Sequence, residues 1–166
     1  MNISARAILT GIWGATVIAA LAAPLLFSAS LPTAAFFTCL PFSFICHQMP
    51  ERSFTLLQHP LAVCHRCSGI YLGFFLGTLL APLFFRMPPP ARRACVLAAT
   101  ALLTLDALLP FTGLWNGFWQ CRFLTGLAFG CAAAPFAVMG LDEILKGAFK
   151  DAFRKTHNLS KELFYE

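Results

Sequence analysis

Four long apolar stretches constrain the fold of this chain more than any other feature. They cover residues 7–27, 67–85, 94–109 and 121–141, and together they contain only two charged residues. A helix of about 20 apolar residues crosses the hydrocarbon core of a bilayer, which is roughly 30 Å thick. The sequence therefore predicts an all-α integral membrane protein, folded as a four-helix transmembrane bundle in a single domain of residues 1–166.

The composition agrees with a membrane location. Hydrophobic residues make up 58% of the chain and charged residues 11%, against about 45–50% and about 25% in soluble domains. The net charge of +5 invites a nucleic-acid interpretation, but no basic run is interleaved with aromatic residues. Basic residues in membrane proteins mark the cytoplasmic flanks of the spans. We therefore expect the lipid bilayer as a partner, and no nucleic acid.

The distribution of basic residues predicts the orientation. If the N-terminus lies inside, the outer loops contain only Arg52, Arg66 and Arg122. Because basic residues are enriched in cytoplasmic segments, we expect both termini in the cytoplasm and a multi-pass protein of the cell (inner, or cytoplasmic) membrane. The inner segments would hold nine basic residues: Arg6, Arg86, Arg92, Arg93, Lys146, Lys150, Arg154, Lys155 and Lys161.

Both ends of the chain allow two interpretations. The first apolar stretch follows Arg6 and resembles a signal peptide, but it exceeds the usual apolar length of about 7–15 residues, which favours a retained span. The tail at residues 142–156 has apolar residues at three-and-four spacing opposite basic ones. This pattern is typical of an amphipathic helix on an anionic membrane surface; the alternative is a helical extension of the fourth span.

Two stripes of small residues predict how the helices pack. Gly69, Gly73 and Gly77 stand four apart in the second stretch, and Gly126 and Gly130 begin a similar stripe in the fourth. Such stripes let helix backbones approach closely in a membrane. We expect the two stripes to face each other within the bundle, while a homo-oligomer through the stripe of Gly69, Gly73 and Gly77 is the alternative.

The unusual polar residues gather at one predicted end. The outer loop at residues 31–67 is broken by prolines, which indicates an interfacial piece followed by turns and short helical pieces. Three of the seven cysteines and three of the four histidines fall between Cys46 and Cys67. Asp106 and Arg122 should reach the same end from the third and fourth helices. Ionisable groups near a membrane are costly and usually functional, so this end is the predicted site.

Two motifs at this end are specific when taken together: Cys46-His47-Gln48-x-Pro50-Glu51-Arg52-Ser53-Phe54 and Cys64-x-Arg66-Cys67-x-Gly69-Ile70-Tyr71-x-Gly73. A weaker third piece combines Asp106 with Arg122, Thr125 and Gly126. At these residues the chain resembles a known family, the uncharacterised small prokaryotic membrane proteins catalogued as domain of unknown function 2085. The resemblance implies a membrane location and no assigned activity.

Metal binding is the first interpretation of the site. A Cys-x-x-Cys pair is a common half-site for zinc, and Cys64 and Cys67 form one. Cys46 would add a third thiolate, and His47 or His65 would complete a Cys₃His set. His47 is the preferred fourth ligand, or else a residue that orients a ligand. Glu51 and Arg52 are the candidate catalytic residues, since Glu51 could act as a base toward a metal-bound water. Asp106 and Arg122 would form a polar wall that binds a cofactor or substrate, and they could pair with each other.

Two other functions remain open, and the residues do not decide whether the protein is an enzyme. In a membrane thiol–disulfide oxidoreductase, Cys64 and Cys67 would cycle between dithiol and disulfide, with Arg66 and the helix N-terminus lowering a thiol pKa and Cys39, Cys46 or Cys121 as partner cysteine. The helix layout is similar to that of periplasmic thiol oxidases. In a small transporter or lipid-active protein, Arg52, Arg66 and Arg122 would bind an anionic head group.

Overall fold

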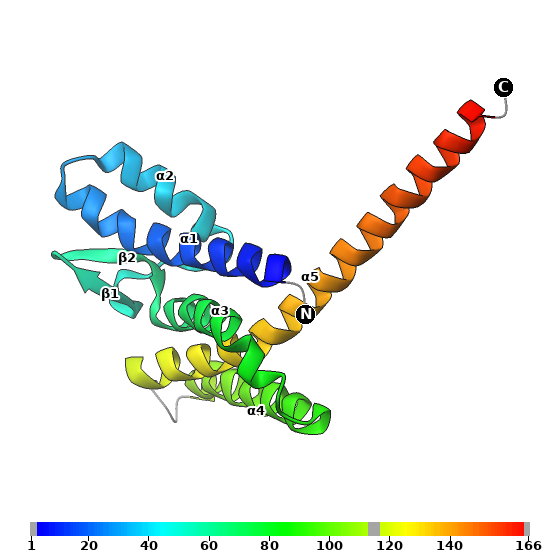
Figure 1. The fold of residues 1–166 in the computed structure, drawn as a ribbon. Helices are drawn as coiled ribbons and strands as arrows, with labels where there is room; N and C mark the ends of the chain where they lie inside the picture. Colours follow the sequence, from blue (N-terminus) through cyan, green and yellow to red (C-terminus); the bar gives the residue numbers. More distant parts are fainter. Residues whose placement is uncertain (1–2, 113–116, 165–166) are drawn as a thin grey trace.

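The chain is almost entirely helical, in a computed structural model that describes residues 3–112 and 117–164, with the side chains of 4–112 and 117–147 (Figure 1). One two-stranded sheet interrupts the helices. The elements, in chain order, are α1 (Ile3–Ser28), α2 (Pro32–Ser43), the 3₁₀ turn η1 (Pro50–Arg52), β1 (Ser53–Leu56), β2 (His59–Cys64), α3 (His65–Phe84), α4 (Pro89–Leu108), the 3₁₀ turn η2 (Leu109–Thr112) and α5 (Trp119–Phe164).

Within the described residues, four helical segments are long and apolar enough to cross a membrane: Ser4–Ser28, His65–Phe84, Pro89–Thr112 and Trp119–Gly147. The predicted fold class, a four-helix membrane protein, is confirmed. The third segment begins earlier than the predicted stretch at residues 94–109, because Pro89 and Pro90 open α4 instead of lying in the turn. Proline is tolerated in the first helical turn, where its missing N–H has no helical partner.

The centre of the fold is the contact between α3 and α5. In this α3–α5 interface, an added Cβ on Gly73 would lie 3.0 Å from the Cα of Gly130, and one on Gly77 would lie 2.7 Å from the Cβ of Ala134. The two small-residue stripes therefore face each other as predicted. Helix α5 covers the first stripe, which is the expected packing within the bundle. A homo-oligomer through that stripe stays a prediction.

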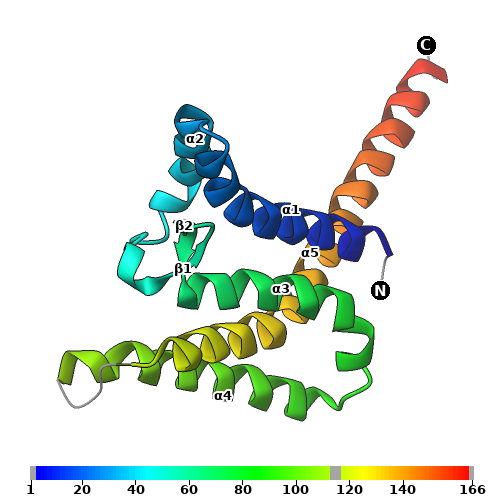
Figure 2. The same ribbon diagram turned by 90° about the vertical axis from the view of Figure 1, so that its left-hand side faces the viewer.

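The remaining helices flank this pair. Helix α1 lies along α3, with the ring of Trp13 stacked on Phe74 at 4.4 Å between centroids, and α4 lies along α5 (Figure 2). Ala20 and Ala23 of α1 contribute to a core cluster with Phe42 and Tyr71. The first apolar stretch is thus an integral part of the core. Leucines on α4, such as Leu97 and Leu105, are largely exposed, as expected of a face that contacts lipid.

The outer loop contains a β-hairpin that the sequence did not indicate. Turns and short helical pieces were expected from Pro50 and Pro60, but β1 and β2 pair antiparallel, with Thr55 opposite Pro60. The turn residues Leu57 and Gln58 both have positive φ, 51° and 66°, as a two-residue hairpin turn requires. Glycine and asparagine usually occupy such positions, so Leu57-Gln58 gave no recognisable turn signal.

The tail continues α5 without a break as far as Phe164. The predicted amphipathic segment at residues 142–156 therefore belongs to the same helix as the fourth span, which is the arrangement the sequence left as an alternative. In Figures 1 and 2 the start of α1 and the end of α5 lie away from the hairpin, at the other end of the bundle. The second outer connection, predicted for residues 110–120, includes residues 113–116, which lie outside the described part of the chain.

Candidate metal centre

Three cysteine sulfurs converge at the hairpin end of the bundle. Cys46 follows α2, Cys64 ends β2 and Cys67 lies in the first turn of α3. Their Sγ atoms all lie within 4.8 Å of one another. Cys46 is buried, with 4% of its surface exposed, and its Sγ accepts a hydrogen bond of 3.2 Å from the backbone N–H of Cys64. The three cysteines thus form one cluster, in which Cys46 is held by a hydrogen bond from the backbone of Cys64.

Local structure explains why these sulfurs meet. The hairpin turns the chain back, so that Ser53 lies opposite Cys64 and the end of β2 lies beside the segment that holds Cys46. At the start of α3, residues three apart lie on the same face of a helix, which brings Cys67 under Cys64. The predicted Cys-x-x-Cys half-site therefore spans a strand end and a helix start, and Cys46 completes it from 18 residues away.

Gln48 anchors the loop that presents Cys46. Its Nε2 donates to the carbonyl oxygens of Cys39 at 2.8 Å and Ala62 at 2.9 Å. One amide therefore ties the loop both to the end of α2 and to β2. Gln48 adopts a positive φ of 48°, so the backbone has a left-handed conformation immediately after His47. Gln48 stands inside the cysteine motif, but its residue type alone does not predict this role.

The surroundings favour the thiolate form of Cys64. Hydrogen bonding with the thiol of Cys46 is the largest cause and that with the thiol of Cys67 the second, and together they lower the pKa of Cys64 below its ordinary value. The backbone amides of Cys67 and Arg66 act in the same direction, while burial opposes them. A thiol that ionises this readily supplies the deprotonated sulfur that a metal ion binds.

The spacing of the sulfurs fits a single metal ion. A Zn–S bond is about 2.3 Å long, which places the sulfurs of a tetrahedral site about 3.8 Å apart. Sulfurs that already lie within 4.8 Å of one another need only small rotamer adjustments to reach that spacing. This Cys₃ group can therefore hold a metal ion, and three soft thiolate donors suit zinc among the common candidates.

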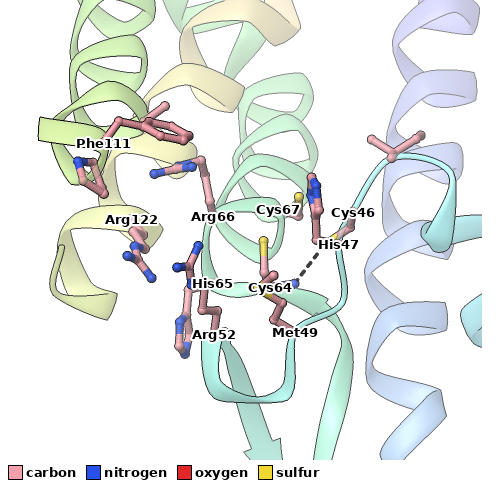
Figure 3. A pocket seen from close by; sticks show the side chains of 13 residues that line it. Cys46, His47, Met49, Arg52, Cys64, His65, Arg66, Cys67, Phe111 and Arg122 are labelled. Atoms are coloured by element: carbon pink, nitrogen blue, oxygen red, sulfur yellow. Dashed lines mark hydrogen bonds between the residues drawn. The ribbon is translucent and has the colours of Figure 1, made fainter. Parts of the chain in front are cut away.

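A cavity of about 590 Å³ opens beside the cluster. Figure 3 shows the cysteines with His47 on one side and the side chains of Arg66 and Arg122 on the other. The cavity lining combines the three cysteines with basic and apolar side chains: His47, Arg52, His65, Arg66 and Arg122, together with Ile45, Met49, Ala107, Pro110 and Phe111.

Asp106 pairs with a different arginine from the one expected. Its Oδ2 accepts a hydrogen bond of 3.1 Å from Nε of Arg66, in an ion pair that includes Nη2 of the same arginine. The hydroxyl of Thr125 lies 3.5 Å from the same carboxylate oxygen. The suggested pairing of Asp106 with Arg122 is therefore corrected to Arg66. Arg66 precedes Cys67 in the first turn of α3, and this places its side chain toward α4.

This pairing also changes the expected role of Arg66. The sequence suggested that its charge would lower a thiol pKa. Its guanidinium instead bonds to Asp106, a carboxylate that is only 7% exposed, while hydrogen bonds from neighbouring thiols and amides act on Cys64. Arg66 therefore joins α3 to α4 at the edge of the cavity, which holds the α4 wall in place.

The other predicted site residues divide into two groups. His47, Arg52 and Arg122 line the cavity, although His47 is exposed and is not one of the mutually close donors. Glu51 is exposed on η1 and is absent from the lining. Cys39 packs at the edge of the core cluster, where burial raises its pKa. The roles proposed for His47, Glu51 and Arg52 remain predictions.

Aromatic rings pack together beside the cavity. Phe54 of β1 stands edge-on to the ring of His65 at 4.5 Å, and it contacts Trp119 at 5.4 Å and Phe123 at 5.6 Å. Phe54 therefore packs the hairpin against the start of α5. The ring of His65, the alternative histidine ligand expected from the sequence, is held in this group, and His65 also lines the cavity.

Comparison with known proteins agrees with the fold and leaves the activity open. Residues 46–136 match the family described as "Predicted membrane protein (DUF2085)". An uncharacterized protein of Methanocaldococcus jannaschii is 32% identical over 114 residues, 66% of this chain and 71% of its own length. Another uncharacterized protein, of Methanothermobacter thermautotrophicus, is 38% identical over 99 residues, 58% of this chain and 86% of its own. No solved structure matches. The chain belongs to the DUF2085 family of predicted membrane proteins.

Proposed function

We propose that Cys46, Cys64 and Cys67 bind a transition metal ion, with zinc as the first candidate. The observation that supports this most directly is the convergence of three sulfurs from three different elements within 4.8 Å. The readily ionised Cys64 supplies the first thiolate. Structural zinc sites usually have four protein ligands, whereas catalytic sites keep one position open. A Cys₃ group beside a cavity resembles the second kind.

His47 is the protein residue best placed to act next to the three thiolates. It follows Cys46 directly and lines the same cavity. A change of its side-chain rotamer would bring it toward the cluster as the fourth ligand. In its present position it would instead border the open coordination site and orient what binds there. Glu51, being exposed on η1, would reach the metal only after a movement of this turn.

We also propose that the site faces the extracytoplasmic side of the cell membrane. The segments predicted to be cytoplasmic hold nine basic residues, and the outer loops at the site's end of the bundle hold three. Basic residues mark the cytoplasmic side. An impermeant maleimide applied to intact cells tests this orientation. A cysteine introduced by Thr55→Cys, in the exposed part of β1, should be labelled, and one introduced by Arg86→Cys, at the other end, should not. The reverse labelling would place the site in the cytoplasm.

Metal analysis of the detergent-purified protein tests the main proposal. We expect about one metal ion per chain, with Cys46, Cys64 and Cys67 protected from thiol reagents until a chelator is added. Cys64→Ser and Cys67→Ser should each lose the metal. Cys95→Ser is the matched control, because Cys95 is exposed on α4 and lies outside the cluster. A chain that binds no metal in its reduced state would contradict the proposal.

Thiol redox chemistry is the second candidate, because the cluster places the Cys64 thiolate beside the thiol of Cys67. If a disulfide between them is the working state, peptide mapping without reductant should recover that cross-link, and reduction should release two thiols. Metal bound with all thiols reduced would exclude this function. A reducible Cys64–Cys67 disulfide in a metal-free protein would support it instead of the metal centre.

A further inference from the structure

Among the residues whose side chains the structure describes, the charged side chains that line the cavity are basic. Arg52, Arg66 and Arg122 belong to η1, α3 and α5, and none of the described Asp or Glu side chains lines the cavity. The charge of Arg66 is compensated by Asp106 from outside the lining. Arg52 forms no ion pair with a residue whose side chain the structure describes. Among the described residues, the positive charge of Arg52 on the cavity lining is therefore uncompensated.

Arg52 and Arg122 both line the cavity beside the sulfurs. Arginine is the preferred side chain for phosphate and carboxylate because its planar fork donates two parallel hydrogen bonds. Since the arginines come from elements far apart in the sequence, the fold itself gathers them around one space.

The rest of the lining is apolar. Ile45 is 74% exposed and Phe111 is 87% exposed, and they border the cavity from the segment after α2 and from η2. Ala107 and Phe111 also fall within the candidate span Pro89–Thr112, so this wall meets the level of the lipid. A cavity with this lining offers both a charged region for a head group and an apolar side for a hydrocarbon chain.

We propose that the cavity binds an anionic amphiphile, with its phosphate or carboxylate head at Arg52 and Arg122 and its hydrocarbon along Ile45 and Phe111. The volume of about 590 Å³ lies within the roughly 300–1,000 Å³ of small-molecule sites. This inference goes beyond the proposed metal site: it assigns a ligand class to the space next to the sulfurs. The arginines and the apolar border carry it whether or not a metal is bound.

Lipid binding to the full chain in a neutral detergent tests the inference. The probes are phosphatidylglycerol, zwitterionic phosphatidylcholine with the same chains, oleate and inorganic phosphate, and the readout is the bound fraction by native mass spectrometry. Phosphatidylglycerol or oleate should bind at least about tenfold more tightly than phosphatidylcholine, since a charged hydrogen bond contributes about that factor or more. Equal affinity for phosphatidylglycerol, oleate and phosphatidylcholine would overturn the proposal.

Three variants separate the cavity from the general membrane surface. Arg52→Gln should weaken binding of the anionic probes about tenfold without changing phosphatidylcholine binding. Arg93→Gln is the matched control, because it removes an exposed arginine from α4 at the other end of the bundle, and it should change neither. Phe111→Ala should weaken the amphiphiles and leave inorganic phosphate unaffected. Equal effects of Arg52→Gln and Arg93→Gln would show that only bulk charge attracts the lipid.

The same samples distinguish this inference from the metal proposal. Metal content is measured for each chain, together with monodispersity as a check of folding. Selective anion binding by a metal-free protein would refute the metal centre and leave the inference standing. Bound metal without anion selectivity would refute the inference alone. Inorganic phosphate binding as tightly as phosphatidylglycerol would identify a free anion as the ligand and overturn the amphiphile.

Discussion

The α3–α5 interface and the cysteine cluster both include residues of α3, but they are built in opposite ways. In the interface, Gly69, Gly73 and Gly77 bring two backbones together within one continuous pair of helices. In the cluster, only Cys67 lies on α3, and the other two cysteines come from a loop and a strand end. The interface thus depends on small residues at regular spacing, while the cluster depends on how an irregular loop is held.

This difference predicts that the two regions fail differently when mutated. Changes in the interface should reduce the stability of the whole fold, whereas changes around the cluster should remove ligand binding and leave the helices packed. Four substitutions, from the largest expected effect to the smallest, probe this separation between the structural and the chemical end of α3.

Gly73→Val should have the largest effect on stability. The new Cβ would meet Leu127 O and lie 3.0 Å from Gly130 Cα, both backbone atoms that cannot move aside, so we expect a loss of about 3 kcal/mol. Thermal unfolding of the purified protein, followed by size exclusion, measures it. Gly140→Val is the matched control, since nothing lies within 4 Å of a Cβ there. Equal melting temperatures of the two variants would show that the interface is not the stabilising contact.

Gln48→Met should chiefly affect the metal. The variant keeps the length of the side chain but loses both hydrogen bonds to Cys39 and Ala62, and loss of such supporting contacts typically costs about 10–100-fold in metal affinity. Competition with a chromogenic chelator measures this. Gln120→Met, at an exposed position of α5, should leave the affinity unchanged. A metal-free Gln48→Met chain as unstable as Gly73→Val would place the loop in the structural core.

Asp106→Asn should have an intermediate effect. It leaves the half-exposed Arg66 without its carboxylate, and we expect about 1–2 kcal/mol, below the 3–5 kcal/mol of fully buried pairs because water screens Arg66. Thermal unfolding in a double-mutant cycle with Arg66→Gln measures the pair itself. Asp106→Asn should cost less when Arg66 is already replaced, and an unchanged cost would mean that the ion pair contributes nothing.

Thr10→Val should have the smallest effect. The hydroxyl of Thr10 donates to that of Thr78 at 3.2 Å between α1 and α3, and such interhelical bonds in membranes average about 0.6 kcal/mol. Thermal unfolding measures the change. Thr16→Val is the control, because its hydroxyl bonds within its own helix, to Ile12 O at 2.9 Å. A larger loss for Thr10→Val than for Gly73→Val would reverse the assignment of α3–α5 as the main interface.

Much of the fold was predictable because the membrane imposes strong rules. The length of an apolar stretch identifies a span, and glycine spacing identifies a close contact, since both follow from local composition and helical periodicity. The pairing of Gly69, Gly73 and Gly77 with Gly126 and Gly130 was predicted on this basis and is confirmed. The gathering of the cysteines at one end also followed, because the order of the spans places their connecting loops.

The hairpin was not predictable, because Leu57 and Gln58 adopt positive φ without glycine or asparagine. The partner of Asp106 was not predictable either. Charge alone allowed either Arg66 or Arg122 as the partner of Asp106. The partner is the arginine whose side chain points toward α4, and this depends on how each helix is rotated about its axis. Packing between residues that are far apart in the sequence determines the hairpin turn and this ion pair, and residue spacing along the chain does not show such packing.

The sequence by itself determined that this protein is a four-helix membrane protein with its cysteine motif at one end, because hydrophobicity and helical periodicity act locally. Only the tertiary structure decided that Cys46 joins Cys64 and Cys67 in one group, that His47 stands beside it, and that a cavity lined by arginines opens there. These features depend on a hairpin and a loop whose positions are set by contacts between distant residues, chiefly the hydrogen bonds of Gln48 and the packing of Phe54.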